Sequence, residues 1–161
     1  MMNLVQTAAR ITIWAASAPT EQDDAAGEQR SGAATNAAAL KVLIVEDEFF
    51  IALDIQAQVE ALGHAVVGIA VSADQAIALT AREKPDVVLM DIRLSGPRDG
   101  IDAAIEIRQR SGLDIIFVTA NTDPGTLERA RSVNPLGVLQ KPLTQPRLRN
   151  ILAARAGPRQ S

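Results

Sequence analysis

Residues 86–91 read Asp-Val-Val-Leu-Met-Asp, so four consecutive apolar side chains stand between two carboxylates. Pro85 precedes this run, and a segment that contains glycine and proline, residues 95–100, follows it. The run is too short for an ordinary helix and contains β-branched residues, which predicts a strand buried on both faces. Asp91 would then end a central strand, where open α/β sheets place their ligands. Taken alone, Asp91 is equally consistent with an ordinary turn residue.

Similar apolar runs recur from Leu40 onward, separated by segments of helical spacing. The sequence predicts helices at residues 51–62, 72–82, 101–111, 124–132 and from Pro146 onward, the third of them marked by Ile101, Ala104, Ile105 and Arg108. It predicts strands at residues 41–45, 65–70, 86–91, 115–119 and 137–140. Five strands alternating with five helices indicate an α/β fold whose parallel sheet is covered on both faces. The expected architecture is a doubly wound, flavodoxin-like five-stranded sheet.

The composition limits the classes of function. The chain has 161 residues, enough for one ordinary domain, and only 2% aromatic residues, so its core must be aliphatic. A net charge of −3 gives no general attraction to nucleic acid or to anionic membranes. The sequence contains no cysteine, which excludes disulfides and thiol chemistry. No apolar run approaches the roughly 18 residues of a membrane span, so we expect a cytoplasmic protein.

The first 39 residues differ in composition from the rest. Residues 19–39 are small, polar or charged and cannot bury enough surface to offset the entropy of ordering. We therefore expect residues 1–39 to be a disordered or weakly structured leader, with apolar residues between Leu4 and Trp14 available for docking. The expected domain covers residues 40–156, and residues 157–161 form a tail.

Polar residues follow the carboxyl ends of four expected strands: Glu46 and Asp47, then Asp91, Thr119 and Lys141. In a parallel sheet these ends share one edge, so we expect the side chains to converge. Clustered carboxylates repel one another unless a cation offsets their charge, and oxygen ligands with open positions suit Mg²⁺. An aspartate can also act as a nucleophile that forms an acyl phosphate, with metal and lysine stabilising the transferred group. Each residue alone has an ordinary structural interpretation, but their joint placement favours phosphoryl chemistry.

Four motifs occur in a fixed order, at residues 42–48 (VLIVEDE), 88–92 (VLMDI), 117–120 (FVTA) and 139–142 (LQKP). Together they resemble the receiver domain of two-component response regulators, and the resemblance covers residues 40 to about 156. It implies the flavodoxin-like fold already expected. It also implies a signalling protein that catalyses only its own phosphorylation and dephosphorylation.

The resemblance implies a role for each residue that matches a motif. Asp91 would be the phosphoacceptor, and Asp47 and Asp91 would bind Mg²⁺ through their side chains. Glu46 would support the metal through water, and the backbone carbonyl of Arg93 would complete the site. Thr119 would be the switch hydroxyl that moves toward the phosphoryl group. Lys141 would form an ion pair with the phosphoryl group, and the Lys141–Pro142 bond would be cis.

The sequence departs from the family pattern at two places. Val138 stands where the family usually has an aromatic residue that turns inward on activation. The switch would then run through Thr119 alone or through another residue. The segment at residues 91–100 is one residue longer than the commonest loop of the family, which leaves the shape of its Ser-Gly-Pro part open.

The implied partners are a sensor histidine kinase or phosphotransfer protein and a downstream protein target. No output domain follows residue 156, so we expect a stand-alone receiver that signals by protein contact. One alternative is a degenerate receiver that acts only as a docking module, although the complete set of acids argues against it. A phosphohydrolase of the haloacid dehalogenase type would need its nucleophile on the first strand. A flavin-binding protein would need a phosphate loop after that strand.

Basic residues dominate the chain after Leu127. Leaving out Lys141, they outnumber acids six to one: Arg129, Arg131, Arg147, Arg149, Arg155 and Arg159 against Glu128. This segment spans the fourth helix, fifth strand and fifth helix, and we expect it to bind an acidic protein partner or to self-associate. A solvated basic face is the plainer alternative. Direct nucleic-acid binding is disfavoured because no aromatics accompany the arginines. The single histidine, His64, is expected at the surface in a turn.

Overall fold

The structure is a computed structural model that describes residues 38–120 and 123–157. The predicted leader, apart from its last two residues, and most of the predicted tail lie outside the described residues. Within the described ranges, no helix is long and apolar enough to cross a membrane.

The described residues form a five-stranded parallel sheet in the order β2-β1-β3-β4-β5. The strands are β1 (Lys41–Val45), β2 (Ala65–Ala70), β3 (Val87–Asp91), β4 (Asp114–Thr119) and β5 (Gly137–Gln140). The helices are α1 (Phe49–Ala61), α2 (Ala73–Glu83), α3 (Gly100–Ser111), α4 (Pro124–Ser132) and α5 (Gln145–Ala156). The predicted fold class, with its five strands and five helices in alternation, is confirmed.

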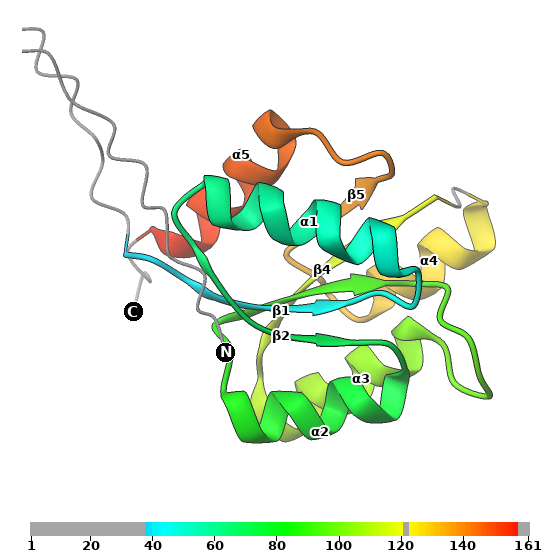
Figure 1. Cartoon of the computed structure of the whole chain (residues 1–161). Coiled ribbons are helices and arrows are strands. Elements are labelled where there is room, and N and C mark those ends of the chain that lie inside the picture. The colour runs from blue at the N-terminus through cyan, green and yellow to red at the C-terminus, as the bar shows by residue number, and fades with distance from the viewer. Residues whose placement is uncertain (1–37, 121–122, 158–161) are drawn as a thin grey trace, which may run out of the picture. The chain divides into compact units, whose positions relative to one another are not determined.

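Helices cover both faces of the sheet (Figure 1), and a hydrophobic cluster lies on each face. Ile55 and Val59 of α1 and Leu148 and Leu152 of α5 pack on one face. The helices α2, α3 and α4 cover the other face with alanines and with larger aliphatic side chains such as Leu79 and Ile107. All five residues of β3 are buried, as expected for the central strand. The core is aliphatic apart from Phe117, which agrees with the low aromatic content.

Local signals explain where the helices begin and end. Ser72 caps α2 by accepting a hydrogen bond from the Gln75 backbone N–H, as expected for a serine before a helix. Asp99 and Asp102 form a reciprocal capping box at the start of α3. Gly112 ends α3 in a left-handed conformation, φ 64°. Of the residues that marked this helix in the sequence, Ile101 and Ala104 are buried, whereas Ile105 is 39% exposed.

The parallel register brings the strand ends to one edge of the sheet. Val45 pairs with Met90, Asp91 with Val118, and Thr119 with Gln140. Gly100, which opens α3, packs so closely on β3 that an added Cβ would lie 1.8 Å from the Asp91 carbonyl oxygen. The start of α3 is therefore pressed directly against the end of the central strand.

Candidate functional site

Three carboxylates meet at the carboxyl edge of the sheet. Oxygens of Glu46, Asp47 and Asp91 lie within 4.8 Å of one another, in an arrangement that could hold a metal ion. Glu46 and Asp91 are buried, with 1% and 5% exposure, and Asp47 is half-buried. The sequence places them there because β1 and β3 are adjacent parallel strands that end at the same level.

Lys141 joins the two buried acids. Its Nζ atom lies 2.7 Å from Glu46 Oε2 and 2.7 Å from Asp91 Oδ2. The lysine backbone N–H donates to the Thr119 carbonyl at 2.9 Å, which fixes its position beside β4. The Lys141–Pro142 bond is cis, as the resemblance implied.

The electrostatics of this cluster follow from burial and charge. Burial is the largest influence on Glu46 and raises its pKa above the ordinary value, while Lys141 opposes the shift and Asp91 adds to it. Burial alone would lower the pKa of Lys141, but the hydrogen bonds with Asp91 and Glu46 outweigh it, and the pKa is raised. Three carboxylates beside one ammonium leave an excess of two negative charges when all are ionised. A divalent cation with oxygen preference fits this donor set.

Asp47 is held by a residue that sequence reasoning missed. The backbone N–H of Ser95 donates to Asp47 Oδ2 at 3.0 Å, and the Ser95 hydroxyl donates to the same oxygen. Ser95 belongs to the Ser-Gly-Pro part of the β3–α3 loop. The unusual loop length was the signal that could have directed attention to it.

Arg93 and Thr119 lie at the same edge. The Arg93 backbone N–H donates to Asp91 Oδ1 at 3.0 Å, and the role of its carbonyl as a metal ligand stays a prediction. Thr119 ends β4 and is buried, with 1% exposure. Its role as switch hydroxyl also stays a prediction.

A comparison with known families agrees with this geometry. The model of the response regulator receiver domain matches residues 42–153. The chain belongs to the response regulator receiver family. Among curated relatives, the transcriptional regulatory protein PdtaR of Mycobacterium tuberculosis is 38% identical over 104 residues, which cover 65% of this chain and 50% of PdtaR. The phyllosphere-induced regulator PhyR of Methylorubrum extorquens is 39% identical over 83 residues, 51% of this chain and 31% of PhyR.

Solved structures of receivers are similar to this one. The signal receiver domain of a modulated diguanylate cyclase from Desulfovibrio desulfuricans G20 has a TM-score of 0.71 and 34% identity. The aligned part covers 74% of this chain and 94% of that domain. The response regulator PhyR from Brucella abortus has a TM-score of 0.62 and 37% identity, covering 74% of this chain and 48% of PhyR. This receiver therefore spans at most about half the length of the curated relatives named here.

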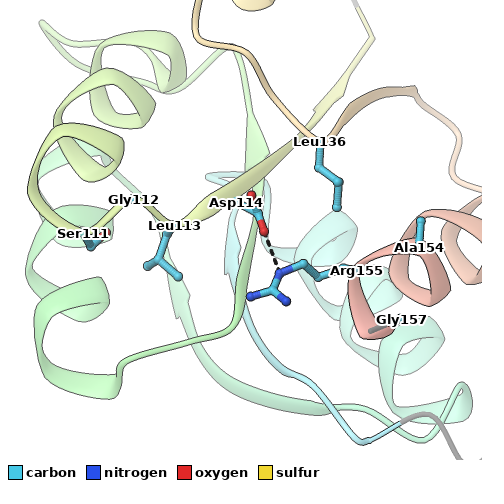
Figure 2. Close-up of a pocket in the computed structure, with 8 residues that line it drawn as sticks. All are labelled: Ser111, Gly112, Leu113, Asp114, Leu136, Ala154, Arg155 and Gly157. Atoms are coloured by element: carbon cyan, nitrogen blue, oxygen red, sulfur yellow. Dashed lines mark ion pairs between the residues drawn. The ribbon is translucent and has the colours of Figure 1, made fainter. Parts of the chain in front are cut away.

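Two cavities differ in their relation to the acidic cluster of this receiver. A cavity of about 510 Å³ lies beside Lys141, and its lining is largely apolar, from α1, Ala120, Pro142 and Leu143, with the acids Glu48 and Asp54 also present. A second cavity, of about 440 Å³, lies at the amino ends of β4 and β5 (Figure 2). Arg155 crosses it to form a 2.7 Å ion pair with Asp114. The second cavity is remote from the strand ends that carry the acids, so only the first borders the site.

His64 follows Gly63 between α1 and β2, as expected, and is half-buried there. Its Nδ1 accepts a hydrogen bond from the Leu40 backbone N–H at 3.2 Å, which joins the starts of β1 and β2. Burial lowers the pKa of His64, consistent with a neutral ring that accepts this bond. The histidine therefore has a structural position in this receiver.

Proposed function

We propose that this receiver accepts one phosphoryl group on Asp91 and transmits the change through contact with another protein. One observation carries the proposal: the carboxylates of Asp91 and Glu46 both form ion pairs with the Lys141 ammonium, and Asp47 lies close by. A protein that served only as a docking module would have no use for a half-buried lysine shared by two buried acids. The receiver family match also favours this function over the phosphohydrolase and flavin-binding alternatives.

The transfer proposed here is a single displacement at phosphorus. A carboxylate oxygen of Asp91 forms a new bond to phosphorus as the bond between phosphorus and a histidine nitrogen of the donor breaks. The electron pair of the broken bond stays on the donor nitrogen, and the product on this chain is an acyl phosphate. Lys141 lies within reach of the same carboxylate and would balance charge on the phosphoryl oxygens.

The residues at this edge fit Mg²⁺. Asp47 and Asp91 would bind it through their carboxylates, Glu46 through water, and Arg93 through its backbone carbonyl. A bound Mg²⁺ would neutralise part of the negative charge that develops on the phosphoryl oxygens during transfer. Thr119, at the end of the neighbouring strand, would hold one phosphoryl oxygen through its hydroxyl.

The face beside the site has properties suited to a phosphodonor protein. Phe49 and Phe50 at the start of α1 are exposed, Phe50 by 83%, and their rings stand edge to face with centroids 5.5 Å apart. The 510 Å³ cavity continues this apolar surface as far as Lys141. Exposed aromatic groups beside an apolar cavity are typical of protein contacts. A sensor histidine kinase or phosphotransfer protein would present its phosphohistidine here.

The output face is smaller than counting charges suggested. Arg129 pairs with Asp99, and Arg155 pairs with Asp114, so each already has an acidic partner within the chain. Arg131 on α4 and Arg147 and Arg149 on α5 are exposed and remain available for an acidic partner or a second copy of the chain.

Intact mass spectrometry tests the chemistry directly. After incubation with Mg²⁺ and acetyl phosphate, the wild-type chain should gain one phosphoryl group, and Asp91→Asn should gain none. Asp74→Asn is a matched control, because Asp74 is an exposed acid on α2. Labelling of Asp91→Asn, or an unmodified wild type, would refute the assignment.

A further inference from the structure

Ser95 holds the one acid of the cluster that Lys141 does not reach. The lysine ammonium contacts Glu46 and Asp91, and within residues 38–120 and 123–157 no cationic side chain forms an ion pair with Asp47. Ser95 supplies two donors in place of a cation, its backbone N–H and its hydroxyl. Both donors bind Oδ2, and among the described residues no hydrogen bond or ion pair is made by Oδ1 of Asp47.

The loop around Ser95 is anchored on both sides. Leu94 is buried in the core, and the Gly100 N–H donates to the Ile92 carbonyl at 2.9 Å, which closes the loop. Gly96 has φ +118°, a backbone conformation that residues other than glycine rarely adopt, and it turns the chain directly after Ser95. Ser95 is therefore presented to Asp47 by a constrained backbone.

We infer that Ser95 is a positioning residue for the divalent metal site, and this inference rests on the proposed function. A carboxylate that binds a metal through one oxygen is oriented by hydrogen bonds to the other. With Oδ2 of Asp47 held by Ser95, Oδ1 is the oxygen left to bind a metal beside Glu46 and Asp91. The side chain then loses less rotational freedom on binding, and affinity rises.

The opposite effect would follow if Ser95 competed with the metal for Asp47. In that case the hydroxyl would have to be displaced on binding, and its removal would strengthen affinity. The sign of the change in affinity therefore separates a positioning role from a competing one.

A Mg²⁺ titration without any phosphodonor, followed by amide NMR shifts, makes this test. Ser95→Ala keeps the backbone N–H and loses the hydroxyl, so its dissociation constant should rise about threefold to tenfold. Ser95→Thr restores a hydroxyl and should bind within about twofold of wild type. Ser132→Ala is the control, because the Ser132 hydroxyl bonds only a backbone carbonyl of α4.

Asp47→Asn separates this inference from the proposed function. If Asp47→Asn loses Mg²⁺ binding and Ser95→Ala binds as wild type or more tightly, the positioning role is overturned and the metal site stands. If Asp47→Asn binds Mg²⁺ as wild type does, Asp47 is not a ligand, and both the site and the role of Ser95 fail.

Discussion

Arg129 of α4 is bound to Asp99 at the start of α3: its Nη1 atom lies 2.9 Å from Asp99 Oδ2. Its Nη2 atom lies 3.5 Å from Asp102 Oδ1, so both acids of the capping box share one guanidinium. Asp99 ends the loop that begins beside Asp91. The contact thus joins α4 to the loop that follows Asp91, the proposed phosphoacceptor.

Replacing Arg129 should loosen α4 without unfolding the protein. Arg129 is 55% exposed, and exposed ion pairs contribute about 1 kcal/mol or less, so Arg129→Gln should barely change the free energy of unfolding. Hydrogen exchange of the α4 amides should nevertheless become faster. Arg131→Gln, an exposed neighbour on the same helix, is the control. Equal exchange rates in the two variants would show that Arg129 does not restrain α4.

Magnesium should stabilise the folded protein through Asp47. A ligand that binds only the folded state at ten times its dissociation constant adds about 1.4 kcal/mol, which raises Tm by a few degrees. Asp47→Asn should lose this increase and should melt higher than wild type without metal, because one repelling charge is gone. Calorimetry with Mg²⁺ and with EDTA measures both effects. An equal Mg²⁺-dependent rise in wild type and variant contradicts the proposed ligand set.

Glu46 should make the metal-free protein less stable as pH rises. Burial raises its folded-state pKa above the unfolded value, so the folded chain holds this proton more tightly than the unfolded chain. By linkage, this contribution to stability is present below pH 4.5 and is lost as pH rises through the folded pKa. Glu46→Gln has no such proton, so its stability relative to wild type should increase over that window. Urea unfolding in EDTA between pH 4.5 and 7.5 measures the free energy of unfolding of both proteins. If the two free energies change in parallel with pH, the prediction is contradicted.

Gly100 should tolerate no side chain. A Cβ there would lie 1.8 Å from the Asp91 carbonyl oxygen and 3.1 Å from the Met90 side chain. Gly100→Ala should lower the free energy of unfolding by about 1–3 kcal/mol through overpacking and should slow acetyl phosphate labelling of Asp91. Gly125→Ala, where the nearest atom is 3.5 Å from the added Cβ, should leave both unchanged or add slight stability. Similar losses in the two variants would refute the close-packing argument.

The fold could be predicted from the sequence, and so could the clustering of the three acids with Lys141. Apolar runs reveal parallel strands, and parallel strands bring their ends together whatever the loops do. The contact between Ser95 and Asp47 depends on a turn at Gly96 whose φ the residue order does not reveal. Pairing of Arg129 with Asp99 joins residues 30 positions apart, so counting charges along the chain overestimated the free basic surface. Ile105 faces outward because the buried stripe of α3 follows Ile101, Ala104 and Ile107.

The output face can be tested by reversing charge on α5. Arg147 and Arg149 are exposed, and we expect the phosphorylated chain to self-associate or bind an acidic partner through them. Charged contacts of this kind weaken as salt screens them. Sedimentation of the wild type with acetyl phosphate and Mg²⁺ should reveal a larger species at low salt that diminishes at high salt. Arg147→Glu with Arg149→Glu should abolish this species while leaving labelling of Asp91 by acetyl phosphate unchanged.

The matched control places the same charge change on the other side of the sheet. Arg82→Glu with Arg110→Glu alters two exposed arginines of α2 and α3 and should preserve the larger species. A loss of assembly in both double variants would point to net charge rather than to a specific face. If the α5 double variant assembles as the wild type does, Arg147 and Arg149 do not form the self-association surface. The output face would then bind an acidic protein partner instead, and the α5 double variant should bind that partner less tightly than the control double variant does.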